Sequence, residues 1–124
     1  MNLISLALGG ALGTLARYIL SEFMRSRTGS SFPWGTLAVN TLGCFAAGFI
    51  LSILLKNREA SGPAFGLFWL TGFCGGFTTF SALVLESSSM ASAGRGGASM
   101  ANVALSLALG FAAFILGRRL LGPF

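Results

Sequence analysis

Four long apolar runs set the strongest limit on what this 124-residue chain can fold into. They cover approximately residues 3–23, 35–55, 64–85 and 98–121. Each is long enough for an α-helix to cross a hydrocarbon core of roughly 30 Å, which takes about 20 residues. The polar segments between them are rich in Gly, Ser and Pro, as is typical of loops. These segments lie at residues 25–33, 56–63 and 87–97. The sequence therefore predicts an all-α membrane protein with four transmembrane helices in a single domain, residues 1–124.

Composition supports this class, because 54% of the residues are hydrophobic, 9% are charged and none is histidine. These values lie far from those of an ordinary soluble domain. The first apolar run lacks the basic segment that precedes the apolar stretch of a cleaved signal peptide. We therefore expect this run to be retained as the first transmembrane helix.

The eight Lys and Arg residues, which give the chain a net charge of +5, are divided almost evenly between the two sides that four crossings create. One side holds Lys56, Arg58, Arg118 and Arg119, and the other holds Arg25, Arg27 and Arg95, with Arg17 as a fourth if it reaches out. Membrane orientation normally follows an excess of Lys and Arg in the cytoplasmic loops. The small bias predicts that the chain inserts in both orientations and pairs as an antiparallel, dual-topology dimer. The alternative is that a minor charge difference or a partner fixes one orientation.

A membrane surface is the expected partner of these basic residues, and nucleic acid is not. The basic residues form no patch interleaved with aromatic side chains. An enzyme is not expected either, because the chain has no histidine and only three carboxylates for acid-base, nucleophilic or metal chemistry. The two cysteines, Cys44 and Cys74, have no metal or disulfide spacing and are interpreted as buried small side chains.

Uncharged hydrogen-bonding side chains within the apolar runs are the remaining candidates for function. They are Thr36, Asn40, Thr41, Thr71, Thr78, Thr79, Ser81 and Ser106. Thr36 and Asn40 are four residues apart and share one helical face. Such side chains often serve only to bond membrane helices together, and this interpretation stays open, above all for Thr41 and Ser106. An unpaired amide is costly in hydrocarbon, so we expect a functional role for Asn40.

The third run contains the unusual segment TGFCGGFTTFS, residues 71–81. Its adjacent glycines and threonines predict a helix broken near Gly75–Thr79. A break in lipid leaves N–H and C=O groups unsatisfied unless an enclosed polar site pairs them. Transport proteins use such breaks to bind ions, so we expect an ion-binding site at mid-membrane. The GxxxG spacing of Gly9 and Gly13 predicts close helix packing.

Phe80 directly follows the predicted break, and its ring edge carries partial positive charge. Placed beside Asn and Thr donors, such an edge could accept a small anion without any fixed cationic residue.

Three segments resemble the signature segments of the Fluc, or CrcB, fluoride channel family. They are GGALGTLARY (9–18), WGTLAVN (34–40) and TGFCGGFTTFS (71–81) followed by Glu86. The resemblance implies an antiparallel homodimer in the plasma or inner membrane, with two pathways that passively export fluoride from a microbial cytoplasm. It also implies a structural sodium ion at the centre of the dimer.

The resemblance assigns roles by position in this sequence. The carbonyls that hold sodium fall on Gly75 and Thr78. The fluoride pathway falls on Asn40, Thr36, Phe80, Ser81, Thr79, Ser106, Glu86 and Arg17.

One departure from the family pattern lies after Ser81, where the chain reads ALVLE in place of the usual TFSxE. Leu83 stands where the family has a second phenylalanine, so one aromatic ring of the expected anion site is missing. Two hypotheses follow: the chain conducts alone with an altered site, or it requires a homologous subunit in a heterodimer.

A small dual-topology multidrug exporter is the alternative from another mechanistic class. Such an exporter needs a carboxylate embedded in the membrane, and the first run offers only Glu22 near its end. A non-transporting assembly subunit would leave Asn40 and the broken segment without a purpose.

Overall fold

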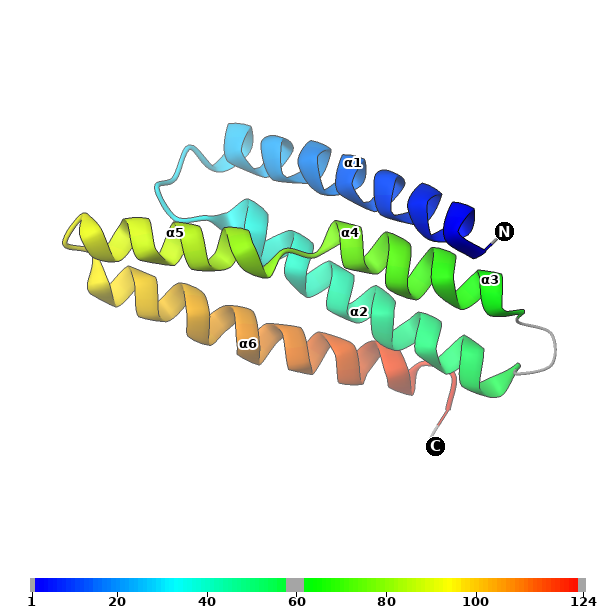
Figure 1. The fold of residues 1–124 in the computed structure, drawn as a ribbon. Coiled ribbons are helices and arrows are strands. Elements are labelled where there is room, and N and C mark those ends of the chain that lie inside the picture. Colours follow the sequence, from blue (N-terminus) through cyan, green and yellow to red (C-terminus); the bar gives the residue numbers. More distant parts are fainter. Residues whose placement is uncertain (1, 58–61, 123–124) are drawn as a thin grey trace.

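The structure, a computed structural model, describes residues 2–57 and 62–122. Within these ranges it contains helices and turns but no strand. Four spans are long and apolar enough to cross a membrane, and they lie side by side (Figure 1). They are α1 (Asn2–Thr28), α2 (Trp34–Lys56), the composite span Pro63–Ser92 and α6 (Gly96–Arg119). The predicted all-α membrane protein with four transmembrane helices is confirmed.

Two of the predicted helices extend further than the apolar runs that indicated them. The first continues to Thr28 and the third to Ser92, so part of each predicted loop is helical. Polar side chains do not stop a helix where it leaves the membrane. The turns instead hold Gly29 and Gly94, whose φ angles of 54° and 75° are left-handed and favour glycine. Residues 58–61, in the predicted loop 56–63, lie outside the described residues.

The third span consists of four helical pieces. These are α3 (Pro63–Gly66), the π-helix η1 (Leu67–Cys74), α4 (Gly75–Phe77) and α5 (Phe80–Ser92). The break falls between α4 and α5, where Thr78 and Thr79 have extended ψ angles of 157° and 114°. The prediction of a broken third helix is confirmed. Gly75 and Gly76 themselves are helical, so the glycine pair precedes the break and does not form it.

Small residues bring the helices into close contact. α1 packs on η1 and α4, where a Cβ atom at Gly9 or Gly13 would clash with carbonyl oxygens of Phe68 and Phe73. A Cβ at Gly76 would lie 2.5 Å from the Gly10 carbonyl oxygen. This confirms the prediction of close packing at Gly9 and Gly13, since a larger side chain would separate the backbones.

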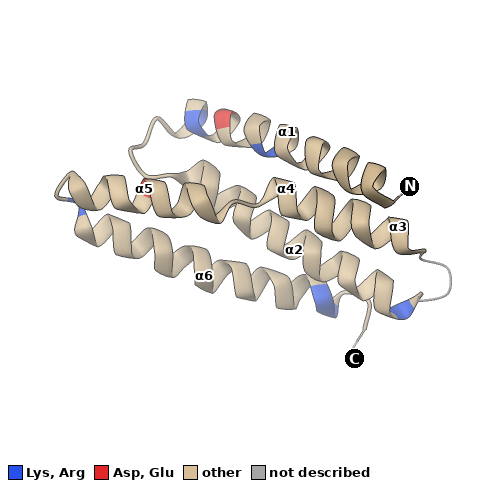
Figure 2. Ribbon diagram, in the orientation of Figure 1, with Lys and Arg blue, Asp and Glu red and all other residues tan. Residues whose placement is uncertain are grey.

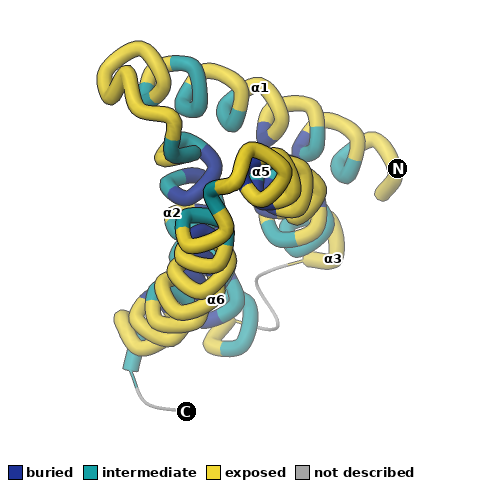
Figure 3. Tube along the Cα trace, turned by 90° about the vertical axis from the view of Figure 1, so that its left-hand side faces the viewer, coloured by how far each residue is buried: buried dark blue, intermediate teal, exposed yellow. Residues whose placement is uncertain are grey.

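α2 and α6 form a second pair of the same kind. A Cβ atom at Gly48 would clash with the Phe114 carbonyl, and one at Gly117 with the Phe45 carbonyl. Buried positions face the interior of the bundle, while the outer faces of α1 and α6 are exposed (Figure 3). The apolar outer faces are those expected to contact lipid.

Charged residues lie mainly near the ends of the long helices (Figure 2). The last turns of the three uninterrupted helices hold Arg25 and Arg27 in α1, Lys56 in α2, and Arg118 and Arg119 in α6. Arg58, which also belongs to the charge comparison, lies outside the described residues. The C-terminal ends of α1 and α2 lie at opposite ends of the bundle (Figure 1). Positive charge is therefore present at both ends of the bundle, with no strong excess at either.

Candidate functional site

The break in the third span is held open by a side chain from α2. The Thr79 N–H donates to Asn40 Oδ1 at 2.7 Å, and Asn40 Nδ2 donates to the Thr79 carbonyl at 3.0 Å. One amide thereby pairs both backbone groups of the same residue. An unpaired backbone group inside a membrane would cost several kcal/mol. Asn40 therefore has a structural role at the break.

Thr79 also begins the helix that follows the break. Its Oγ1 accepts from the Ala82 N–H at 3.2 Å, as expected of an N-cap residue, and lies 3.2 Å from Ser81 Oγ. On the other side, the Thr78 N–H still donates to the Cys74 carbonyl at 3.0 Å. Both helix ends at the break are thus partly satisfied within the chain.

These bonds take away the usual helical donors of two carbonyls. In an α-helix the carbonyl of Gly75 would accept from the Thr79 N–H, and that of Thr78 from the Ala82 N–H. Here the Thr79 N–H donates to Asn40, and the Ala82 N–H donates to Thr79 Oγ1. Gly75 is exposed, and no atom lies within 4 Å of a Cβ built on it. The two carbonyls predicted to hold sodium have therefore lost their helical partners.

A cation at this position would depend on such backbone oxygens. Within residues 2–57 and 62–122, no group of three or more His, Cys, Asp or Glu side chains could hold a metal ion. Hard cations bind oxygen ligands, including backbone carbonyls. The oxygen chemistry of Gly75 and Thr78 fits sodium.

Arg17 contacts the end of α4 from the neighbouring helix. Its Nε donates to the Gly76 carbonyl at 3.1 Å, and Thr14 Oγ1 lies 3.5 Å from the same oxygen. A cation at the C-terminus of a helix is stabilised by the helix dipole. Arg17, expected in the anion pathway, is thus placed next to the break.

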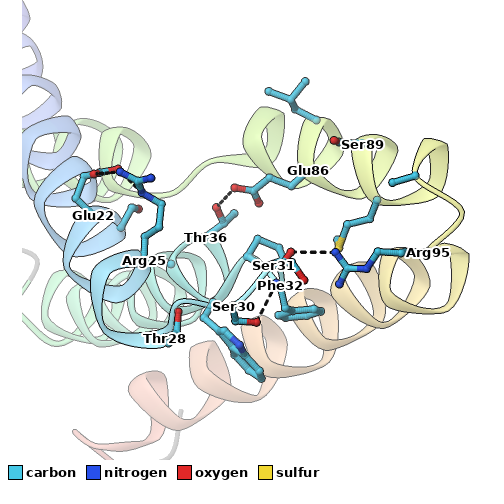
Figure 4. Close-up of a pocket in the computed structure, with 17 residues that line it drawn as sticks. Glu22, Arg25, Thr28, Ser30, Ser31, Phe32, Thr36, Glu86, Ser89 and Arg95 are labelled. Carbon is cyan, nitrogen blue, oxygen red and sulfur yellow. Dashed lines mark hydrogen bonds and ion pairs between the residues drawn. The ribbon is translucent and has the colours of Figure 1, made fainter.

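Thr36 and Glu86 meet one helical turn away from Asn40, toward one end of the bundle. Thr36 Oγ1 donates to Glu86 Oε1 at 2.7 Å, while Glu86 Oε2 is buried and has no partner in the described part of the chain. Both residues line a pocket of about 640 Å³ bounded by α1, α2, α5 and two loops (Figure 4). The polar contacts thus run from this pocket to the break along one face of α2.

Phe80 and Leu83 lie in different surroundings although both belong to the first turn of α5. Phe80 is 75% exposed and lies on the outside of the single chain, whereas Leu83 is 4% exposed and packs inside it. Leu83, where the chain departs from the family pattern, is therefore an interior residue. Phe80 and Ser81 are both exposed on the outside of the single chain.

Ser106 lies apart from the contacts around the break. It lines an apolar pocket of about 350 Å³ between α2 and α6, together with Cys44 and Gly110. Its Oγ is buried and, like Thr41 Oγ1, has no partner among the described residues. None of the hydrogen bonds in the described ranges connects Ser106 to Asn40 or Thr36.

Two polar residues in or beside this region were not singled out from the sequence. Arg95, counted only as a loop charge, lines the larger pocket, and its Nη1 donates to the Ser31 carbonyl at 3.3 Å. Asn102 is completely buried and donates to Ser87 Oγ at 3.0 Å. Asn102 precedes Ser106 by four residues, so the shared helical face was the signal that could have identified it.

The family model for CrcB-like protein, Camphor Resistance (CrcB), matches residues 4–118. The chain belongs to the CrcB family. The matched region includes the break and most of all four spans. Membership in the CrcB family confirms the resemblance recognised in the three signature segments and identifies a multi-pass membrane protein.

Relatives of this CrcB protein carry the name Fluoride-specific ion channel FluC. One from Desulforapulum autotrophicum is 45% identical over 114 residues, which is 92% of this chain and 90% of the relative. One from Roseiflexus sp. is 43% identical over 117 residues, covering 94% of each chain. One from Agrobacterium fabrum is 39% identical over 124 residues, covering 97% of this chain and 98% of the relative. A family of ion channels confirms the prediction that this CrcB protein is not an enzyme.

Proposed function

We propose that this chain forms a fluoride channel that lets fluoride leave the cytoplasm passively. The support is the name of its relatives, Fluoride-specific ion channel FluC, at 39% to 45% identity over nearly the whole chain. The observation that carries the proposal is the pairing of Asn40 with both backbone groups of Thr79. A chain that only needed to span the membrane would have no use for a helix broken and re-paired in this way.

The pathway we propose follows the polar face of α2 from the pocket to the break. Fluoride loses strongly bound water on entering a membrane, so donors must replace that water. Asn40 has two amide hydrogens, and one of them is used on the Thr79 carbonyl. The second amide hydrogen is available to an anion, and so is one hydroxyl hydrogen of the Thr79–Ser81 pair, because their mutual bond uses only one of the two. Thr36 donates to Glu86, so its hydroxyl would have to turn from that carboxylate to bind an anion. Phe80 adds the positive edge of its ring.

Ser106 and Glu86 are proposed members of the same pathway that need a second copy to complete it. Ser106 has a buried hydroxyl without a partner in the described part of the chain. Glu86 has a carboxylate oxygen, Oε2, that is also buried and has no partner in the described part of the chain. Arg17 is proposed to stabilise the break through the Gly76 carbonyl rather than to bind the anion.

An antiparallel, dual-topology homodimer accounts for the exposed groups at the break. A lipid-facing carbonyl without a donor is costly, and Gly75 lies on the exposed surface of the single chain. A second copy would cover this surface and bring its own Gly75 and Thr78 to a common two-fold axis. Four carbonyls would then hold one sodium ion, which would supply a fixed positive charge where two breaks meet. The expected location is the plasma membrane, or the inner membrane of a bacterium that has two.

The multidrug-exporter alternative loses the carboxylate on which it depends. Glu22 is bonded to Arg25, with 2.6 Å between Glu22 Oε2 and Arg25 Nη2. This ion pair lies near the exposed end of α1. A carboxylate paired in this way is poorly placed to exchange protons with a lipophilic cation at mid-membrane.

Purified protein in liposomes tests the proposed function. Vesicles loaded with fluoride or with chloride and containing only this protein are diluted into anion-free buffer, and the released anion is followed with an ion-selective electrode. We expect rapid passive release of fluoride and little release of chloride. Proton-coupled transport of a lipophilic cation, with no fluoride release, would instead favour an exporter.

A further inference from the structure

The larger pocket lies at the end of the bundle where the chain passes from α1 to α2 and from α5 to α6 (Figure 4). Its lining is rich in hydroxyl groups, from Ser21, Thr28, Ser30, Ser31, Thr36 and Ser89. Trp34 also lines it and is 42% exposed. The pocket is a polar mouth that leads to Thr36, the first donor of the proposed pathway.

Four charged side chains line this mouth, and three of them have polar side-chain partners. Glu22 and Arg25 form a two-point ion pair, with N···O distances of 2.6 and 3.2 Å. Glu86 accepts from Thr36, and its second oxygen is buried. Arg95 bonds to the Ser31 carbonyl and has no carboxylate partner within the described residues.

We propose that Arg95 concentrates small anions at this mouth. Its guanidinium makes no salt bridge with a described carboxylate and lies outside the transmembrane spans. Glu86, the carboxylate of the lining that no described cation pairs, is half-buried and bonded to Thr36. A fixed charge in a cleft with low-dielectric walls raises the local concentration of counter-ions. One unit charge several ångströms away should raise that concentration about two- to five-fold at low ionic strength, with salt removing the effect.

The physiological meaning of this inference rests on the proposed fluoride channel, but the anion enrichment itself does not. In an antiparallel dimer each membrane face would carry one such mouth, so Arg95 would act on entry from either side. The competing explanation is structural. The bond from Arg95 to Ser31 connects the turn before α6 to the loop before α2, and Arg95 would then only stabilise the contact between these two segments.

Fluoride flux at two ionic strengths separates these explanations. Arg95→Lys keeps the positive charge but loses the planar guanidinium, and Arg95→Gln removes the charge but keeps a hydrogen-bond donor. Concentration by charge predicts about two- to five-fold lower flux for Arg95→Gln at low ionic strength, no difference at high ionic strength, and near-normal flux for Arg95→Lys. Equal losses in both variants at every ionic strength would overturn the proposal.

The matched control is Arg27→Gln, which removes the same charge outside the pocket. Arg27 is exposed and lies 5.1 Å from the centroid of the Phe23 ring. Its loss should leave the flux unchanged at low ionic strength. A decrease as large as that of Arg95→Gln would show that only the total charge of the protein matters, and it would overturn the role of this mouth.

Tryptophan quenching tests the enrichment without any flux. The chain has two tryptophans, so Trp69→Phe leaves Trp34, in the lining of the mouth, as the single emitter. In vesicles of neutral lipid at low ionic strength, we expect iodide to quench Trp34 about two- to five-fold less in Arg95→Gln than in the parent. Quenching by neutral acrylamide should not change, which reports that the fold and the exposure of Trp34 are intact.

Glu22→Gln should have the opposite effect, because it leaves Arg25 uncompensated and should raise iodide quenching. Identical iodide quenching in the parent, Arg95→Gln and Glu22→Gln would overturn the inference even if the protein conducts fluoride. Charge-dependent quenching in a protein that releases no fluoride would support the inference and contradict the proposed function.

Discussion

Replacing Asn40 with alanine should disable the channel by releasing the break. The substitution removes the acceptor of the Thr79 N–H and the donor to the Thr79 carbonyl, which lie 2.7 and 3.0 Å away. Leaving one buried polar group unpaired costs about 1–3 kcal/mol, and measured bonds between membrane helices average nearer 0.6 kcal/mol. With about 1–2 kcal/mol for each bond, a value between these two scales, two lost bonds destabilise this geometry by about 2–4 kcal/mol. Its population relative to other arrangements then falls about 30- to 1000-fold.

The assay is fluoride release from liposomes, with size-exclusion chromatography to measure assembly. We expect Asn40→Ala to reduce the rate of release at least tenfold while the dimer stays assembled. Thr41→Ala is the matched control, because the neighbouring Thr41 hydroxyl is buried and has no partner in the described part of the chain. Truncating it removes no bond and should change the rate less than twofold.

Normal fluoride release by Asn40→Ala would refute this reasoning. It would show that Thr79 finds other partners at no cost, and it would remove Asn40 from the pathway. Loss of the dimer would instead show that the amide acts on assembly before it acts on conduction.

Four further outcomes are expected. Gly13→Ala should lower stability to denaturant by about 1–3 kcal/mol because its Cβ meets the Phe73 carbonyl, whereas Gly97→Ala, which meets nothing within 4 Å, should be neutral or stabilising. Ser52→Ala should cost about 1 kcal/mol in the same assay, since Ser52 Oγ loses its 2.6 Å bond to the Arg118 carbonyl; an unchanged midpoint would contradict this. Replacing sodium with a large organic cation should slowly abolish fluoride release, and full activity after prolonged exposure would argue against a structural sodium ion. The chain should conduct alone despite the departure at Leu83, and Leu83→Phe should destabilise it because this position is 4% exposed; a silent parent rescued by a homologous subunit would instead establish the heterodimer.

Much of the fold was predictable because membrane insertion imposes local rules. A chain in hydrocarbon must satisfy its backbone within each segment, so apolar runs of about 20 residues become helices. The close packing at Gly9 and Gly13 was predictable for a related reason, since small residues let membrane helices approach. The helix ends were less predictable, because Ser-rich segments stay helical until Gly29 and Gly94 permit the turn.

The site was predictable as a set of residues but not as an arrangement. The sequence alone identified Asn40 as an amide that needs a partner and the segment around Thr79 as a break that needs one too. It did not pair them, because 39 residues separate them and only the packing of α2 against the third span brings them together. The same limit explains the position of the break: Gly76 is needed for contact with Gly10, and the helix opens at Thr79 because Asn40 can replace the hydrogen bonds that are lost there.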